Sequence, residues 1–266
     1  MGFEDLLLEK DGGIATITLN NPEKLNAFSP KMGESLSLAI DEIAKDDEIR
    51  VVIVTGAGRG FCSGADVSSF KASRGEAAEP SRYSPFQEAT GWPYALAFPK
   101  LSKPVIAAVN GPCAGGGFSL AMSCDIRIAS ERAMFIVAQV ARALVPDLGL
   151  THFLPSTMGT AKSLELMLTA DRIDAAEAER LGIVSRVVPP DKLMKVAREL
   201  AAKIIQQAPI SVALTKQIVW QSLLADLARQ LDLESWSVQV CFQTEDHQAA
   251  ARAFIEKRPQ PQFKGK

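Results

Sequence analysis

The sequence is poor in the residues on which several kinds of chemistry depend. Its 266 residues include only two histidines, His152 and His247, and four scattered cysteines with no Cys-x-x-Cys pair. Neither histidine lies in a His-Glu-x-x-His or similar pattern, so we expect no metal site. The chain begins MGFED, without a basic and then apolar leader. Together with the unpaired cysteines, this favours a reducing cytoplasm.

Long apolar runs and an excess of charge are also missing. The apolar run at residues 105–109 is far shorter than the ~20 residues that span a bilayer, so we expect no transmembrane segment. The formal net charge is −2, from 29 basic and 31 acidic residues. Nucleic acid is therefore not a favoured partner. Apolar residues at 47% and charged residues at 23% are typical of a globular protein with a sizeable core.

The periodicity of apolar residues predicts an α/β fold. Residues 14–19 alternate as a half-buried strand does, and residues 29–43 have helical spacing after the Ser29-Pro30 start. These segments indicate a β-β-α unit. Further strands are expected at four short apolar runs, residues 51–54, 105–109, 126–129 and 184–188.

Two other segments differ from this strand-rich pattern. Residues 72–85 are small, polar and proline-bearing, which predicts a flexible loop beside the site. After Pro189-Pro190, helical patterns cover residues 192–207, 210–227 and 231–256. We therefore divide the chain into a core at residues 1–190 and a helical region at residues 191–266.

Two glycine-rich turns each follow a strand-like run and lead into a helix-like one. They are residues 60–66 (GFCSGAD) and 110–117 (NGPCAGGG), and their backbone N–H groups could converge on one oxygen as an oxyanion hole. Asp147 lies further on, as a lone carboxylate among apolar residues, where a base for carbon-acid chemistry is expected. The alternatives are structural glycine turns and an Asp147 that only caps a following helix.

Motifs along essentially the whole chain resemble those of the enoyl-CoA hydratase/isomerase family of the crotonase superfamily. They are NPEKLNA at residues 21–27, TGAGRGFCSGAD at 55–66, AVNG at 108–111, the triple glycine at 115–117, CDI at 124–126 and FIEKRP at 254–259. The tail at residues 261–266 is similar to that of isomerases acting on the ring epoxide of phenylacetyl-CoA. The resemblance implies a crotonase-like spiral of ββα units in residues 1–190 and a trimerisation region in residues 191–266.

The same resemblance implies roles for individual residues. Ala65 and Gly116 would supply the two N–H groups that hold a thioester oxygen. The two glutamates that hydratases of the family use to add water correspond to Ser119 and Gln139, which cannot act as carboxylate bases. Isomerases of the family place one acid at the position of Asp147. We therefore expect an acyl-CoA isomerase in which Asp147 moves a proton between carbons of the acyl group.

For the CoA part of the substrate, the resemblance places Lys24 and Lys257 near phosphates. Asp66 and Val67, with Ala65, would line the adenine pocket. Ser119 and Gln139, at the positions of the hydratase acids, are expected to be substrate-binding residues. CoA enters as a thioester substrate, so no cofactor is expected, and the family forms homotrimers or hexamers. Trp92 and Phe98 are candidate acyl-pocket contacts, although aromatic side chains usually pack in the core.

Other functions remain open from the residues alone. Gly117-Phe118-Ser119 resembles half of a nucleophile elbow, but a thioester hydrolase would need a histidine beside Ser119. Attack by Asp147 on an aromatic ring, as in the related dehalogenases, would also need a histidine base. An enoyl-CoA hydratase and a non-catalytic acyl-CoA-binding protein are further alternatives. The direction of the Asp147 carboxylate distinguishes the binding protein from an enzyme.

Overall fold

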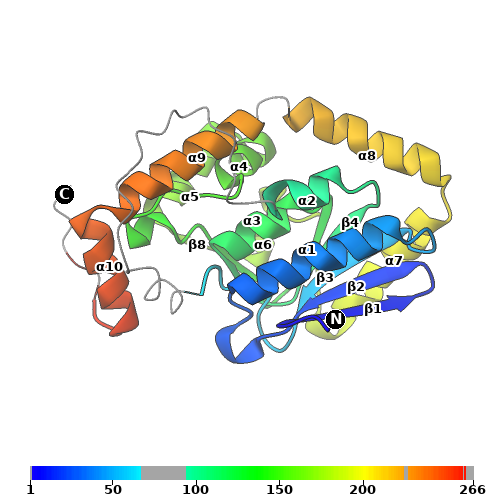
Figure 1. Ribbon diagram of the computed structural model, residues 1–266, viewed down its shortest axis with the longest axis horizontal. Helices are drawn as coiled ribbons and strands as arrows, with labels where there is room; N and C mark the ends of the chain where they lie inside the picture. Colours follow the sequence, from blue (N-terminus) through cyan, green and yellow to red (C-terminus); the bar gives the residue numbers. More distant parts are fainter. Residues whose placement is uncertain (1, 67–93, 225–226, 260, 262–266) are drawn as a thin grey trace.

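A computed structural model describes residues 2–66, 94–224, 227–259 and 261 (Figure 1). The predicted loop at residues 72–85, together with Val67 and Trp92, lies outside these described residues. No helix within the described part of the chain is long and apolar enough to cross a membrane.

The centre of the structure is a six-stranded sheet with strand order β1-β2-β3-β4-β6-β9. Its strands are β1 (Leu6–Asp11), β2 (Ile14–Leu19), β3 (Val51–Gly56), β4 (Val105–Val109), β6 (Ile126–Ser130) and β9 (Arg186–Val188). β1 pairs with β2 in antiparallel register, and the other neighbours are parallel. The apolar runs that predicted β2, β3, β4 and β6 therefore form the buried middle of one sheet.

Helices cover both faces of this sheet, which explains its uninterrupted apolar strands. Along β3, Val52 and Val54 belong to the main core on the face of α1 (Pro30–Lys45), whereas Val51 and Ile53 pack towards α7 (Leu193–Ile205). Figure 1 shows α1 and α7 on opposite sides of the strands. The predicted start of α1 is confirmed, because Ser29 Oγ accepts a hydrogen bond from Met32 N at 3.1 Å.

A second, three-stranded sheet stands beside the first and leads to the two glycine turns. It has the order β5-β7-β8 and comprises β5 (Pro112–Ala114), β7 (Met134–Ile136) and β8 (Arg172–Asp174). The sequence analysis missed these strands because three residues are too few to show a period. Gly115 N, directly after β5, donates to Ile136 O at the end of β7 (3.0 Å). This bond fixes the start of the next helix against the end of β7.

The remaining helices fill the space around the sheets and form the C-terminal part of the chain. They are α2 (Tyr94–Lys100), α3 (Gly116–Ser123), α4 (Leu150–Met158), α5 (Thr160–Thr169), α6 (Ala175–Arg180), α8 (Pro209–Leu224), α9 (Leu227–Phe242) and α10 (Glu245–Ile255), with 3-10 turns η1 (Pro22–Lys24), η3 (Val140–Arg142) and η4 (Pro190–Lys192). The single helix predicted for residues 231–256 is wrong. Thr244 divides it, because its side chain accepts a hydrogen bond from His247 N and caps α10.

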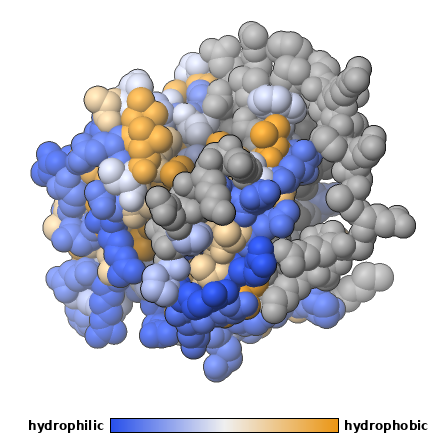
Figure 2. All heavy atoms as spheres, turned by 90° about the vertical axis from the view of Figure 1, so that its left-hand side faces the viewer, coloured by the Kyte–Doolittle hydropathy of each residue, from blue (hydrophilic) through white to orange (hydrophobic). Residues whose placement is uncertain are grey.

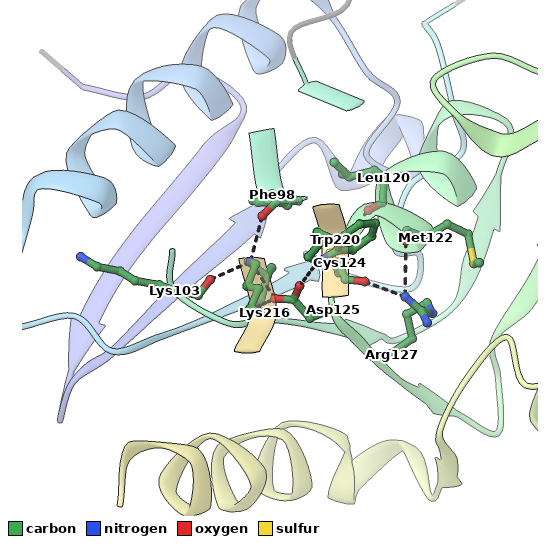
Figure 3. Close-up of polar contacts among 10 residues, drawn as sticks. Phe98, Lys103, Leu120, Met122, Cys124, Asp125, Arg127, Lys216 and Trp220 are labelled. Carbon is green, nitrogen blue, oxygen red and sulfur yellow. Dashed lines mark hydrogen bonds and ion pairs between the residues drawn. The ribbon is translucent and has the colours of Figure 1, made fainter. Parts of the chain in front are cut away.

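A buried polar cluster attaches α8 to the core (Figure 3). Lys216 Nζ lies 2.8 Å from Asp125 Oδ2 and donates to the carbonyl oxygens of Phe98 and Lys103. Trp220 Nε1, one turn further along α8, donates to Asp125 Oδ1 at 2.5 Å. These bonds satisfy all three Lys216 donors and both Asp125 oxygens, so the cluster acts as a structural connection between α8, α2 and the start of β6.

Candidate active site

The first arm of the site is the turn that ends at Ala65. Phe28 N donates to Gly64 O at 2.7 Å, and Asp66 N donates to Phe28 O at 3.0 Å. In this parallel bridge the backbone groups of residues 64 and 66 face Phe28, so the N–H of Ala65 between them faces the other way. Ala65 is exposed, and no described residue accepts a hydrogen bond from its N–H. The turn therefore presents one free backbone donor.

The second arm is the N-terminus of α3. Gly115 is the N-cap, and its carbonyl accepts from the N–H groups of Phe118 and Ser119. Gly116, the first residue of α3, has an N–H without an acceptor among the described residues, as expected for the first turn of a helix. The helix dipole adds partial positive charge at this end. An oxygen with developing negative charge would be stabilised here.

Glycines allow the two arms to approach each other. Gly64 has a φ of +93°, and a Cβ atom on it would lie 2.9 Å from Ala114 O. Gly115 has a φ of +52°, and a Cβ atom on it would lie 4.0 Å from the Cα of Gly64. A Cβ atom on Gly117 would lie 2.3 Å from Cys62 O. The structure therefore brings together the turns that carry Ala65 and Gly116, and larger residues at these positions would separate them.

Asp147 lies beside the second arm and not at a helix cap. Helix α4 starts at Leu150 with Gly149 as its N-cap, so the predicted alternative of a capping Asp147 is wrong. Leu148, the next residue, reaches Gly116, since a Cβ atom on that glycine would lie 3.3 Å from Leu148 Cδ1. The Asp147 carboxylate accepts instead from Gln139 Nε2, at 3.1 Å from Oδ1. Burial raises the pKa of the Asp147 carboxyl, and the Gln139 bond offsets part of this rise.

Ser119 and Gln139, the positions that correspond to the hydratase acids, both bind Asp147. Ser119 Oγ on α3 donates to the carbonyl oxygen of Asp147 at 2.9 Å. Gln139, at the start of η3, donates to its side chain. One residue thus holds the backbone of Asp147 and the other holds its carboxylate. Ser119 has no histidine among its described hydrogen-bond partners, so nothing here supports the nucleophile of a thioester hydrolase.

Two of the residues predicted to contact CoA are neighbours. Lys24 Nζ and Asp66 Oδ2 form an ion pair at 2.7 Å, which places a cation next to Ala65. Lys257 follows α10 and is exposed, and no described contact connects it with Lys24. Its predicted place near CoA phosphates stays a prediction, as does the role of Val67.

The cysteines near the two arms are inert. Cys62 and Cys113 are fully buried. Burial raises the pKa of the Cys62 thiol to about 12 and raises that of Cys113 well above its usual range. A thiolate nucleophile is therefore disfavoured at either position.

A cavity of about 510 Å³ lies under α8, away from the two arms. Its lining includes Asp125, Lys216 and Trp220 of the cluster in Figure 3, and also His152, but none of the predicted site residues.

Phe98 is fully buried in the main core, so it packs there and its predicted contact with an acyl group is not supported. Nearby, Arg127 donates to Cys124 O at 2.6 Å and so stabilises the C-terminal end of α3.

The sequence analysis missed the residues that support the site from the C-terminal helices. His247 Nδ1, in the first turn of α10, lies 2.9 Å from Arg142 O, and the Arg142 guanidinium lies 4.4 Å from the centre of the Phe254 ring. Arg142 belongs to η3, the segment between Gln139 and Asp147. Helical spacing showed that α10 has an apolar face, but contained no signal for its partner.

Comparisons with known proteins agree with this architecture. The family model described as enoyl-CoA hydratase/isomerase matches residues 9–266. A short-chain-enoyl-CoA hydratase of Clostridium acetobutylicum is 40% identical over 267 residues, covering 100% of both chains. A 1,2-epoxyphenylacetyl-CoA isomerase of Escherichia coli K12 is 36% identical over 268 residues, covering 99% of this chain and 100% of that protein.

A solved structure shows the same fold. The crystal structure of an enoyl-CoA hydratase from Mycobacterium avium subsp. paratuberculosis superposes with a TM-score of 0.85 at 29% identity, covering 99% of this chain and 100% of that one. The mixed α/β architecture is therefore the crotonase fold that the sequence predicted. This chain belongs to the enoyl-CoA hydratase/isomerase family of the crotonase superfamily.

Proposed function

We propose that this enzyme is an acyl-CoA isomerase, in which Asp147 is the single acid/base. The observation that carries the proposal is the cluster around Asp147. Ser119 on α3 binds its backbone carbonyl, and Gln139 binds its carboxylate, so Asp147 is the one carboxylate in this cluster. One acid can remove a proton from a carbon and return it to another. Water addition by the family's usual route would use two.

The geometry supports the following sequence of steps. The N–H groups of Ala65 and Gly116 hold the thioester oxygen, and Asp147 takes a proton from the carbon next to the thioester. The electrons move onto the oxygen, giving a dienolate that the two N–H groups stabilise. Asp147 then returns the proton to a carbon further along the chain. The product is the conjugated isomer, and the enzyme ends in its starting protonation state.

The substrate is proposed to be a CoA thioester, with CoA as part of the substrate and not a resident cofactor. Lys24, paired with Asp66 next to Ala65, supplies a cation for a CoA phosphate. A straight-chain 3-enoyl-CoA and a ring-derived thioester both fit this chemistry. The similarity to the Escherichia coli 1,2-epoxyphenylacetyl-CoA isomerase supports the ring-derived class.

Enoyl-CoA hydration is the second candidate, because the Clostridium acetobutylicum relative at 40% identity is named a hydratase. The two candidates are tested together with purified wild type and Asp147→Asn. Isomerisation of a 3-enoyl-CoA raises the ultraviolet absorbance of the conjugated product, whereas hydration of crotonyl-CoA lowers it. We expect wild-type isomerisation and a loss of about 10²–10⁴-fold in Asp147→Asn. Hydration of crotonyl-CoA that survives in Asp147→Asn would contradict the proposal.

We further propose that the C-terminal helices join copies of this chain into a homotrimer or a hexamer. On α8 the residues Ile210 and Ile218 are 74% and 64% exposed. Figure 2 views another side of the molecule, where α10 lies in Figure 1, and shows apolar surface among hydrophilic side chains. Light scattering should give an oligomer for the wild type and a smaller particle for Ile218→Glu. A monomeric wild type would contradict this assembly.

A further inference from the structure

We propose that Gln139 is a positioning residue that selects which Asp147 oxygen acts as the base and keeps that carboxylate ionisable. The inference rests on the proposed function, because it assigns a role in the same proton transfer. Its basis is the hydrogen bond from Gln139 Nε2 to Asp147 Oδ1, at 3.1 Å. Apart from Gln139, the carboxylate accepts in the described structure only from the backbone N–H of Asp147 itself, and no other side chain donates to it. The bond therefore leaves Oδ2 as the oxygen that receives the substrate proton.

Gln139 is held rigidly enough to perform this role. Its side chain is buried, with the residue 7% exposed. Its carbonyl oxygen accepts from Arg142 N at 2.8 Å and from Leu144 N at 3.1 Å, which fixes its backbone at the start of η3. The Gly115 N–H bond to Ile136 O fixes the segment before it. The amide therefore starts from a fixed backbone position, and little side-chain freedom is left to lose when it binds the carboxylate.

The same amide lies against the oxyanion arm. A Cβ atom on Gly115 would lie 3.9 Å from both Cδ and Nε2 of Gln139. Gln139 thus lies near Gly115, the residue before Gly116, and binds Asp147 through the same amide nitrogen. Its other amide atom, Oε1, is buried and has no hydrogen-bond partner in the described structure. A buried acceptor is left unpaired while Nε2 points to Asp147, so the carboxylate determines the orientation of the amide.

Among the described residues, no charged group competes with Gln139 as a partner of the Asp147 carboxylate. Helix α3 carries no titratable side chain, and the raised pKa values of the Cys62 and Cys113 thiols keep both groups protonated. Arg142 on η3 donates to Ala138 O and lies over the Phe254 ring.

The other titratable groups on adjoining elements also have different neighbours. Asp66 is paired with Lys24, and His152 on α4 lines the cavity under α8. Lys162 and Glu165 on α5 are paired with each other, and His247 on α10 contacts Arg142 O. In the described structure, burial therefore raises the pKa of the Asp147 carboxyl, and the bonds from Gln139 and from the backbone N–H of Asp147 itself lower it.

The test compares Gln139→Met with Ser119→Ala. Met has a similar length and no donor, so it removes the bond to the carboxylate. Ser119→Ala is the matched control, because it removes a bond to the same residue's backbone carbonyl. Both variants are assayed with a 3-enoyl-CoA across pH. We expect the acid limb of kcat/KM to move upward by about one pH unit in Gln139→Met, and to keep its wild-type position in Ser119→Ala.

A second measurement does not depend on turnover. In carbon-13 NMR of aspartate-labelled protein, the Asp147 signal is assigned as the one missing in Asp147→Asn, and it is titrated in the wild type and in Gln139→Met. An upward shift of its midpoint in Gln139→Met supports the inference, even if 3-enoyl-CoA is not turned over and the proposed function fails. An unchanged midpoint, or an acid limb that moves equally in both variants, overturns it.

Discussion

Gly64 packs directly against Gly116: a Cβ atom built on Gly64 would lie 3.4 Å from the backbone nitrogen of Gly116. The two residues come from different turns, one before Ala65 and the other at the start of α3. Their contact sets the separation of the two N–H donors. The absence of a side chain at residue 64 is therefore a requirement of the site and not only of the turn.

Gly64→Ala is expected to lower kcat by about 10²–10³-fold, the effect of losing one oxyanion donor. The added methyl group would press against Ala114 O and push the arms apart, and the φ of +93° also disfavours alanine. The measurement is steady-state kinetics with an acyl-CoA substrate. Gly12→Ala is the control, since Gly12 has a φ of +57° but open space around it. Equal losses of kcat in both variants would refute the explanation.

Asp147→Asn is expected to increase stability at neutral pH. Burial raises the pKa of Asp147 in the folded state, so ionisation of this buried carboxyl above that pKa lowers the free energy of unfolding. Stability from this group is complete below the unfolded pKa of about 3.9 and is lost as pH rises through the folded value. Thermal unfolding at neutral pH should therefore give a higher Tm for Asp147→Asn. The difference should vanish at a pH below 4, and a lower Tm at neutral pH would contradict the argument.

Lys216→Met should lower the free energy of unfolding by about 3–5 kcal/mol, because it leaves the buried Asp125 carboxylate without its cation. The carbonyl oxygens of Phe98 and Lys103 lose their donor as well. Denaturant titration at a fixed protein concentration measures the change. Lys162→Met, which breaks the more exposed pair with Glu165, should cost less than about 1 kcal/mol. Similar costs for the two variants would show that the cluster in Figure 3 adds nothing through burial.

His247→Phe should lower both stability and kcat. The ring can keep its edge contact with Phe242 but loses the bond to Arg142 O, which costs about 1–3 kcal/mol when the carbonyl is buried. Since Arg142 lies in η3 between Gln139 and Asp147, a less rigid η3 should also displace the Asp147 carboxylate and so lower kcat. Thr244→Ala is the comparison, because it removes only the cap of α10, for about 1 kcal/mol. A wild-type kcat in His247→Phe would show that the contact of α10 with η3 does not affect catalysis.

The regular elements could be predicted where local signals are strong. The strand runs at residues 51–54 and 105–109 appear as β3 and β4, and Ser29 caps α1 as expected. The cap of α6 is equally local, because the Asp174 side chain accepts from Glu177 N three residues later. The break at Thr244 had a comparable signal, a capping residue followed by two acidic residues, but the long apolar stripe of residues 231–256 concealed it.

The site could be predicted only as separate pieces. The glycine turns and Asp147 were visible as motifs, because each depends on its immediate neighbours. The contact between Gln139 and Asp147 was not, since both residues lie outside regular helices and strands and the bond depends on how η3 turns back. The approach of Gly64 to Gly116 depends on the packing of two turns from distant parts of the chain. Periodicity contains no information about such contacts.

The cluster around Asp125 also determines when this protein can finish folding during its synthesis. Asp125 leaves the ribosome long before Trp220, its partner 95 residues later in the chain. At about 5–20 residues per second, the carboxylate waits roughly 5–20 seconds for α8. During that time the N-terminal strands can pair, but the Asp125 carboxylate must stay hydrated, because its partners Lys216 and Trp220 on α8 have not yet been made. Closure of the core on this side is therefore a late event, timed by translation of the C-terminal helices.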